Sequence, residues 1–482
     1  MDMDLLAAKV SELAGFVWNG LLLYLLVGTG IIFTIRTRFI QVRKFGTGFK
    51  RLFGSISLNG EKAGKEGMSS FQAVATSIAA QVGTGNITGC ATAMISGGPG
   101  AIFWMWVAAF FGMATIYGEA VLAQTFKTTD GTGQVIGGPV YYIRQAFKGI
   151  FGKILAGFFA LAIIFALGFT GNMVQSNAIS NAFREALGVP TWIVGVILAV
   201  VAAFIFLGGV TRIASVTEKL VPVMAAFYLL GGLVMLIANI TNLPHAFALI
   251  FEGAFNPQAI LGGAAGIGVR EAMRYGVARG VFTNEAGMGS SAIAHAASNV
   301  QEPAEQGMWG IFEVFIATLS VCSITALVIL TSGVYQENAA LLAIQSGTVT
   351  SAMVGAPLSA AAFSTVFGRF GVVFVAVCLL LFAFTSLLGS SYYGERGLQY
   401  LTGTDRWRWP YRAAFLLAVV AGSVGDVAVV WQLADIFNGL MALPNLCALL
   451  LLSPEALGLL NGWMTVRTDG AAHRGRSRRA GR

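Results

Sequence analysis

The chain has 482 residues, of which 56% are hydrophobic and 11% are charged, and its mean hydropathy is +0.75. Soluble domains carry about 25% charged residues, so this composition excludes a soluble globular protein and indicates a multi-pass membrane protein. The formal net charge of +8 could suggest a nucleic-acid partner. In a membrane protein, however, basic residues mark topology and contact anionic lipid, so we expect no nucleic-acid binding.

Catalytic and metal-binding motifs are missing from the sequence. It contains no His-Glu-x-x-His, no Walker-type phosphate loop and no Gly-x-Ser-x-Gly elbow. The four cysteines fall in apolar segments without metal-like spacing, which is typical of small, buried, reduced side chains. We therefore expect no enzyme activity, no cofactor and no transition metal.

Hydropathy predicts eleven membrane-spanning helices. The first, at 13–35, has no charged residue and is too long for the core of a signal peptide. The others are predicted at 69–95, 99–125, 152–183, 190–210, 216–240, 259–297, 306–333, 370–396, 409–424 and 428–453. Charged residues interrupt the 259–297 segment, so part of it is expected to lie at the interface or to re-enter the membrane.

Basic residues gather on one side of this predicted topology. Of the 30 Lys and Arg residues, 24 follow the first, third, fifth and ninth spans or lie in the tail. The positive-inside rule then places the N-terminus outside and the C-terminus in the cytoplasm, which agrees with an odd number of spans. We expect the protein in the plasma membrane, that is, the bacterial inner membrane.

The predicted spans form one extra helix and two halves of five. The expected segments are an extra N-terminal helix at 1–36, a basic cytoplasmic loop at 37–68, a first repeat at 69–240, an extracellular connection at 241–258, a second repeat at 259–453 and a basic cytoplasmic tail at 454–482. Because each half has an odd number of spans, the halves cross in opposite orientation. This is the pattern of an inverted-repeat secondary transporter.

Each half opens with a span that glycine and polar residues interrupt, VGTGNITG at 82–89 and NEAGMGSS at 284–291. Each glycine weakens a helix by roughly 1 kcal/mol relative to alanine, so both spans are predicted to open near their middle. Backbone groups freed inside a bilayer need polar partners, which an ion or a polar solute can supply. Helix packing through small residues explains one such motif, but two in matching positions favour a binding site.

At these motifs the chain resembles the alanine or glycine:cation symporter family. The resemblance rests on FQAVATSIAAQVGTGNI at 71–87, GNMVQ at 171–175, VFTNEAGMGS at 281–290 and SYYGE at 391–395, and it covers almost the whole chain. It implies an all-α, LeuT-type fold with a five-plus-five inverted repeat and one extra N-terminal helix. It also implies sodium-coupled symport of small neutral amino acids into the cell by alternating access.

The resemblance further implies binding residues. The substrate is expected at Thr84, Gly85, Asn86, Gln175, Gly287, Met288 and Ser390. One sodium ion is expected between the carbonyls of Ala79 and Val82 and the hydroxyls of Thr385 and Ser386, and a second near Gln81 and Asn86. The N-terminus of a helix at the first break would offer N–H groups to a carboxylate, and carbonyl oxygens suit a hard cation. Structural roles stay open: the two hydroxyls can bond to carbonyls one turn back, and Gln175 can bond between helices.

Ser390 departs from the family pattern. Many relatives have Trp here, at a position that faces the substrate side chain in LeuT-type proteins. Replacing an indole by a hydroxymethyl group opens volume and adds polarity. We therefore expect a substrate larger or more polar than alanine, such as serine, threonine or glutamine.

Four acidic residues fall inside predicted spans: Glu119, Glu285, Glu313 and Asp435. Acids within a membrane are functional candidates, either for proton coupling or for attracting cations. The structural alternative is an ion pair, for example between Glu285 and Arg279 or Arg274. Asp435 could instead lie at a helix end in contact with water.

Three alternative functions would give the protein different properties. A proton-coupled symporter would transport without sodium and stop when a protonophore is added. A cation channel needs a continuous pore, commonly from symmetric subunits, which an inverted repeat within one chain argues against. A membrane-bound sensor would bind an amino acid without moving it.

Overall fold

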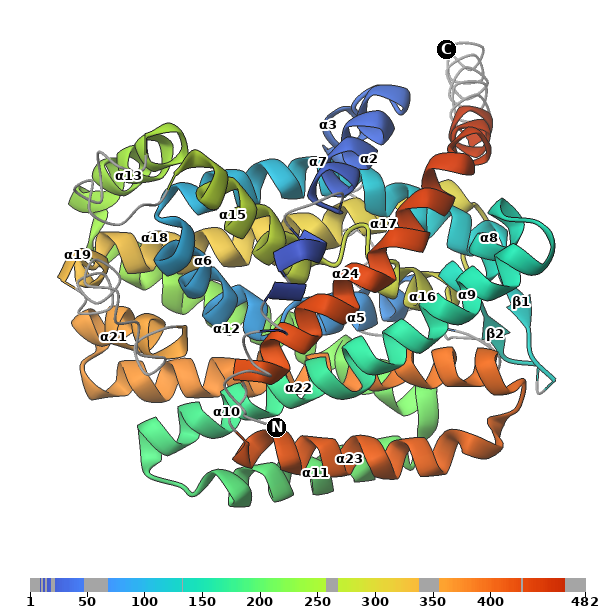
Figure 1. Ribbon diagram of the computed structural model, residues 1–482. Coiled ribbons are helices and arrows are strands. Elements are labelled where there is room, and N and C mark those ends of the chain that lie inside the picture. The colour runs from blue at the N-terminus through green and yellow to red at the C-terminus, as the bar shows by residue number, and fades with distance from the viewer. Residues whose placement is uncertain are drawn as a thin grey trace, which may run out of the picture.

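The computed structural model describes residues 9, 12–13, 15–18, 22–46, 68–131, 133–256, 268–337, 355–425 and 428–463. Over these ranges the fold is helical (Figure 1), except for one antiparallel hairpin and one isolated bridge between Met68 and Ser298. In the hairpin, β1 (Thr128–Thr129) pairs with β2 (Val135–Ile136). The expected all-α class is therefore confirmed.

Six helices in the described ranges are long and apolar enough to cross a membrane. They are α7 (Gly100–Thr125), the run of α9, η3 and α10 (Gly149–Leu187), α12 (Gly209–Ala238), the run of α17, η5 and α18 (Pro303–Thr331), α22 (Arg369–Thr402), and Val430–Leu451 in α24 (Ala428–Leu451). Three apolar helices are shorter: α2 (Leu23–Arg36), α11 (Thr191–Phe206) and α21 (Ala356–Phe367). The protein is thus a multi-pass membrane protein, while the count of eleven spans stays a prediction.

The remaining helical segments are short or interrupted. They are α3 (Ile40–Arg43), α5 (Ser70–Gln81), η2 (Gly85–Gly89), α6 (Cys90–Gly97), α8 (Pro139–Ala146), η4 (Ile240–Asn242), α13 (Leu243–Phe255), α15 (Val269–Asn284), α16 (Ser290–Ala296), α19 (Val334–Glu337), η7 (Asp405–Trp407) and α23 (Arg408–Val424). Within the long runs, η3 (Ile164–Gly171) lies between α9 (Gly149–Ile163) and α10 (Asn172–Leu187). Likewise, η5 (Phe315–Cys322) lies between α17 (Pro303–Val314) and α18 (Ser323–Thr331).

Among the helices that lie outside the predicted spans, the two longest are α13 and α21. The first lies in the predicted connection 241–258, and the second lies between the predicted spans 306–333 and 370–396. Each has proline in its first turn, where the missing N–H would have no helical partner. Proline at a helix start is a local signal that a search for long apolar runs does not register.

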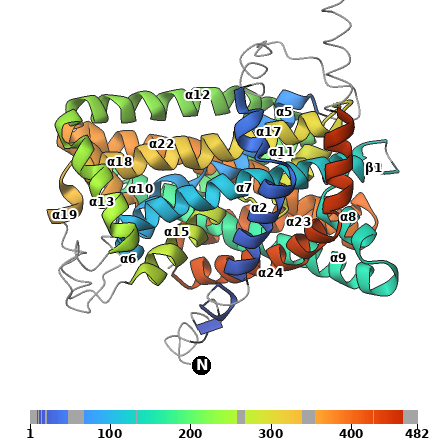
Figure 2. The ribbon, with the colours of Figure 1, turned by 90° about the horizontal axis from the view of Figure 1, so that it is seen from above.

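Figures 1 and 2 show α7, α12 and α22 running across the molecule along a common direction. The helix α7 packs against α2, α15 and α17, and α22 packs against α9, α10 and α21. The interrupted helix α5 contacts α12, α16 and α22. Both predicted interruptions therefore lie among long helices, where freed backbone groups can meet side chains rather than lipid.

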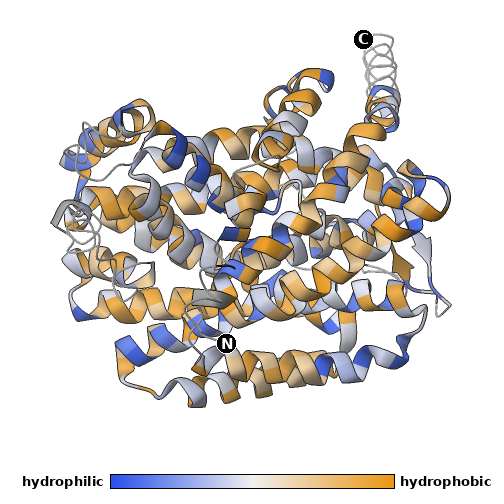
Figure 3. Ribbon diagram, in the orientation of Figure 1, coloured by the Kyte–Doolittle hydropathy of each residue, from blue (hydrophilic) through white to orange (hydrophobic). Residues whose placement is uncertain are grey.

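Apolar residues dominate the long helices (Figure 3). Large apolar side chains stay exposed on the outer helices, including Phe204 on α11 and Leu230 and Ile237 on α12. In water such surfaces would be costly to expose, whereas lipid tails cover them without a polar partner. The outer faces of these helices are thus built for a bilayer.

Candidate functional site

The first interruption separates α5 from η2. The helix α5 starts with a capping box, in which Ser69 and Gln72 bond reciprocally. It ends at Gln81, and the ψ of 90° at the next residue, Val82, lies outside the helical region. Two side chains accept the N–H groups freed at the break. The N–H of Gly83 donates to Asn86 Oδ1 at 2.9 Å, and that of Thr84 donates to Gln175 Oε1 at 3.0 Å.

Asn86 holds this break together. Besides accepting from Gly83, its amide donates to the carbonyl of Ala317 on η5 at 2.6 Å, while Thr325 donates to the Asn86 carbonyl at 2.9 Å. The side chain is fully buried. Both ends of the Asn86 amide are therefore bound to protein groups.

The second interruption separates α15 from α16 and has an unusual backbone. Gly287 and Gly289 have φ values of 89° and 83°, a left-handed conformation that glycine adopts without strain. Glu285 has φ 55°, which is uncommon for a residue with a side chain. A Cβ atom on Gly287 would lie 2.7 Å from Leu26 of α2, so the extra N-terminal helix packs directly on this break.

A small cavity lies between the two interruptions. Its lining includes five residues expected from the sequence, namely Gln81, Gly85, Gln175, Met288 and Ser390. It also includes Ala80, Gly83, Leu167, Gly171, Phe282, Glu285 and Asn438. The two interruptions therefore meet η3, α10, α22 and α24 around one small space.

Three expected substrate residues do not line this cavity. Thr84 contributes a backbone N–H that faces Gln175, and Asn86 braces the break. The carbonyl of Gly287 accepts from Asn445 on α24 at 3.0 Å. Asn438 also lines the cavity but was not expected from the sequence, although amides in the apolar helix α24 are a readable signal.

The two hydroxyls expected at a sodium ion have different hydrogen-bond partners. Ser386 Oγ contacts the carbonyls of Ala79 at 3.1 Å and Ala80 at 2.9 Å. Thr385 Oγ1 instead donates to Leu381 and Phe382 of its own helix and contacts the sulfur of Met224. Of these two hydroxyls, that of Ser386 bonds to the end of α5 and that of Thr385 does not.

A chain of fully buried polar side chains continues away from the cavity. Gln81 Nε2 donates to Glu313 Oε1 at 3.0 Å, and His295 Nε2 lies 3.0 Å from the same oxygen. Gln306 bonds the other ring nitrogen of His295 at 2.7 Å. Gln81 therefore connects the cavity to α16 and α17.

The other buried acids have defined partners. Asn445 donates to Glu119 Oε1 at 2.6 Å, and Ser290 donates to Glu285. The ion pair considered for Glu285 was wrong, because Arg279 binds Asp435 through both terminal nitrogens at 3.2 and 3.0 Å. Asp435 is therefore paired with arginine on α15, not simply solvated.

Arg274 also has another partner, Glu271, at 3.3 Å. Neither arginine considered for Glu285 is consequently available to it. The carboxylate of Glu285 remains in the cavity wall without either of these cations.

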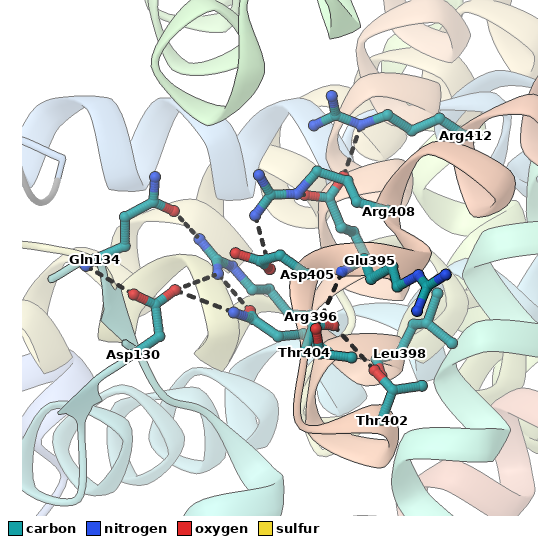
Figure 4. A network of polar contacts seen from close by, with 12 residues as sticks. Asp130, Gln134, Glu395, Arg396, Leu398, Thr402, Thr404, Asp405, Arg408 and Arg412 are labelled. Atoms are coloured by element: carbon teal, nitrogen blue, oxygen red, sulfur yellow. Dashed lines mark hydrogen bonds and ion pairs between the residues drawn. The ribbon is translucent and has the colours of Figure 1, made fainter. Parts of the chain in front are cut away.

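A second polar cluster joins the β1–β2 hairpin to the end of α22 (Figure 4). Arg396 donates to Gln134 at 3.1 Å and lies 3.8 Å from Asp130, which also accepts from Gln399 at 3.0 Å. Next to it, Glu395 pairs with Arg408 at 2.7 Å and Arg412 at 2.8 Å. These contacts tie three segments together at one end of the helices.

The profile described as "Sodium:alanine symporter family" matches residues 3–476. Curated relatives of similar length also match. The sodium/alanine symporter AgcS of Methanococcus maripaludis is 41% identical over 96% of this chain and 98% of its own. The probable sodium/glutamine symporter GlnT of Bacillus subtilis is 40% identical over 94% of this chain and 90% of its own.

Among solved structures, MhsT in complex with L-phenylalanine matches with a TM-score of 0.56. The match covers 79% of this chain and 89% of MhsT, at 13% sequence identity. At that identity the similarity concerns the fold alone. It confirms the LeuT-like fold that the sequence motifs implied.

Proposed function

Since this chain belongs to the sodium:alanine symporter family, we propose that it uses a sodium gradient to drive uptake of a small neutral amino acid by alternating access. The relatives described above are named as a sodium/alanine symporter and a probable sodium/glutamine symporter. The observation that carries the proposal here is the polar cavity between the two interrupted helices. Interrupted helices at matching positions of two repeats are typical substrate sites in secondary transporters.

The substrate carboxylate binds at the first interruption in this proposal. Gln175 now accepts the Thr84 N–H, so its amide oxygen occupies the position that a carboxylate oxygen would take. When the substrate enters, Gln175 turns to donate its amide N–H to the carboxylate. Gly85 and Met288 complete the wall, Gly287 shapes the second interruption beside it, and Asn86 keeps the first break open.

Sodium binds beside the substrate, between α5 and α22. Ser386 supplies a hydroxyl next to the Ala79 carbonyl, and Val82 and Thr385 complete the proposed ligand set. The second proposed sodium ion lies near Gln81 and Asn86. Because Asn86 binds protein groups through both ends of its amide, the ion uses one lone pair of Gln81 Oε1 and leaves the other lone pair for the substrate. Oxygen ligands of this kind suit a hard cation.

The proposed topology has eleven spans, an outside N-terminus and a cytoplasmic C-terminus in the plasma membrane. Its inverted repeats are 69–240 and 259–453, joined by the extracellular connection 241–258. The extra helix at 1–36, the loop at 37–68 and the tail at 454–482 lie outside the repeats. Attaching a periplasmic or cytoplasmic reporter to each terminus would test this orientation.

The function is tested in proteoliposomes that contain the purified protein. An inward sodium gradient is expected to drive accumulation of labelled alanine, serine or glutamine, and a potassium gradient of the same size is not. Uptake that persists without sodium and stops with a protonophore would contradict sodium coupling. Saturable binding without uptake would instead indicate a sensor.

A further inference from the structure

Glu285 is the charged side chain of the cavity, because no other described residue in its lining is ionisable. The residue is 4% exposed and accepts a hydrogen bond from Ser290. Removing a carboxylate from water costs several kcal/mol unless a cation and further hydrogen bonds replace the water. One hydroxyl donor does not replace a charge partner.

No described Lys or Arg supplies that charge. Arg279 is paired with Asp435, and Arg274 with Glu271. The ionisable group that acts on Glu285 from the neighbouring helix α17 is Glu313, which has the same sign. The carboxylate of Glu285 is therefore placed to receive a positive charge from a ligand.

The backbone holds Glu285 in this position despite an unfavourable conformation. At φ 55° and ψ 8° it follows the last residue of α15; its N–H donates to Val281 and its carbonyl accepts from Met288. A left-handed conformation is unfavourable for a non-glycine residue, and such conformations are concentrated at ligand sites. The chain thus accepts strain at the residue that brings a carboxylate to the cavity.

Two more acceptors line the same cavity. Gln81 Oε1 and Asn438 Oδ1 have no hydrogen-bond partner among the described residues, and the two residues are only 3% and 2% exposed. Buried amide oxygens are rarely left without a donor. Together with Glu285, the cavity therefore offers one negative charge and two unused acceptors, and what is missing is a cationic donor.

We propose that Glu285, together with Gln81 and Asn438, binds the α-ammonium group of the transported amino acid. The inference rests on the proposed function, since it requires a zwitterionic substrate in this cavity. An ammonium group has three N–H donors, which match one carboxylate and two amide oxygens. The substrate carboxylate then lies toward the Thr84 N–H, so each end of the zwitterion meets a complementary group.

The test compares amino acids with their 2-hydroxy acids, in which a hydroxyl replaces the ammonium group. Dissociation constants of the purified protein in saturating sodium are measured for glycine and glycolate, alanine and lactate, and serine and glycerate. The wild type is expected to prefer the amino acid by roughly 30-fold or more, as for a buried charge pair. Glu285→Gln keeps the shape and the bond with Ser290, and is expected to bring this ratio close to one.

Glu119→Gln is the matched control. Glu119 is another fully buried carboxylate that accepts from an asparagine, but it does not line the cavity. Its substitution is expected to leave the preference for amino acids unchanged. A similar loss of preference in both variants would contradict a specific role for Glu285.

Other outcomes separate the inference from the proposed function. A wild type that binds hydroxy acid and amino acid equally well overturns the inference without any variant. A Glu285→Gln protein that keeps the wild-type ratio but loses the stabilisation by sodium alone makes Glu285 a sodium ligand, which also overturns it. If the wild type binds neither these three amino acids nor threonine or glutamine at any sodium concentration, the proposed function itself fails.

Glu285→Asp covers the case in which the glutamine variant does not fold. Aspartate keeps the negative charge, but its side chain is shorter by one methylene group, so the carboxylate lies farther from the substrate. An intermediate ratio between amino acid and hydroxy acid is expected. An unchanged ratio would contradict direct contact between the carboxylate and the ammonium group.

Discussion

Thr385 and Ser386 are adjacent residues whose hydroxyls meet different partners. Ser386 lies against the carbonyls of Ala79 and Ala80, whereas Thr385 bonds back to its own helix. If sodium binds between α5 and α22, Ser386→Ala removes a ligand of the ion. Thr385→Val removes a hydroxyl that has to rotate away from its own helix before it can bind the ion.

The sodium concentration for half-maximal thermal stabilisation is therefore expected to rise about tenfold in Ser386→Ala, as for a lost bond to a charged group. In Thr385→Val the rise should be smaller. Sodium titrations of the melting temperature measure both. A larger effect at Thr385 would place the ion on the other side of α22.

Ser390 tests which amino acids fit the cavity. It lines the cavity with Gly83, Gln175 and Met288, and it is 4% exposed. Ser390→Trp fills space next to the substrate, so glutamine and threonine are expected to stop competing for uptake while glycine and alanine still compete. Ser390→Ala, the control, removes the hydroxyl but not the space, and should retain the larger substrates. An unchanged profile in the tryptophan variant would contradict a role in specificity.

At the scale of elements, the first interruption depends on glycine at one position more than at another. A Cβ atom on Gly83 would lie 2.4 Å from Ser386 Oγ and 3.0 Å from the Gln175 amide, whereas one on Gly89 meets nothing within 4 Å. Gly83→Ala is therefore expected to push α22 and α10 away from the break. Gly89→Ala introduces no clash, and its expected effect is only to favour the helical conformation at this position.

Sodium-dependent binding is accordingly expected to be lost in Gly83→Ala. Gly89→Ala should bind normally and melt at the same or a slightly higher temperature, because alanine is favoured over glycine in a helix by up to about 1 kcal/mol. Ligand-induced shifts of the melting temperature compare the two. Equal behaviour would mean that the contacts at Gly83 do not shape the site.

At the scale of the whole molecule, the hairpin cluster joins segments far apart in the chain. Asp130 is nearly buried and accepts from Gln399, with Arg396 beside it (Figure 4). Asp405 pairs with Arg408 three residues away, and both of these side chains are more exposed. Exposed pairs of this kind contribute about 0–1 kcal/mol, so the two acids should differ in their effect on stability.

Asp130→Ala is therefore expected to lower the melting temperature of the purified protein by several degrees, since it removes one member of a buried network. Asp405→Ala should change it little. Thermal unfolding of both variants in the same detergent decides the comparison. A larger loss for Asp405 would show that the hairpin does not brace the helices.

Local patterns were enough to predict much of the fold. The interruptions near 83 and 285–289 follow from glycine, which needs no neighbour to weaken a helix. Gln81, Gln175 and Ser390 were reached through their motifs, and they line the cavity. Asn438 was missed because α24 passes the cavity late in the chain, and periodicity alone does not say which face of a helix meets a partner.

The sequence by itself determined the membrane class, the two interrupted helices and the family. Hydropathy, glycine spacing and motifs are properties of neighbouring residues, so they are readable without a fold. Only the tertiary structure decided that Arg279 pairs with Asp435, that Thr385 turns away from α5, and that Glu285 meets Gln81 and Asn438 at one cavity. These contacts depend on how each helix is rotated and packed against its neighbours, which is settled by the whole molecule.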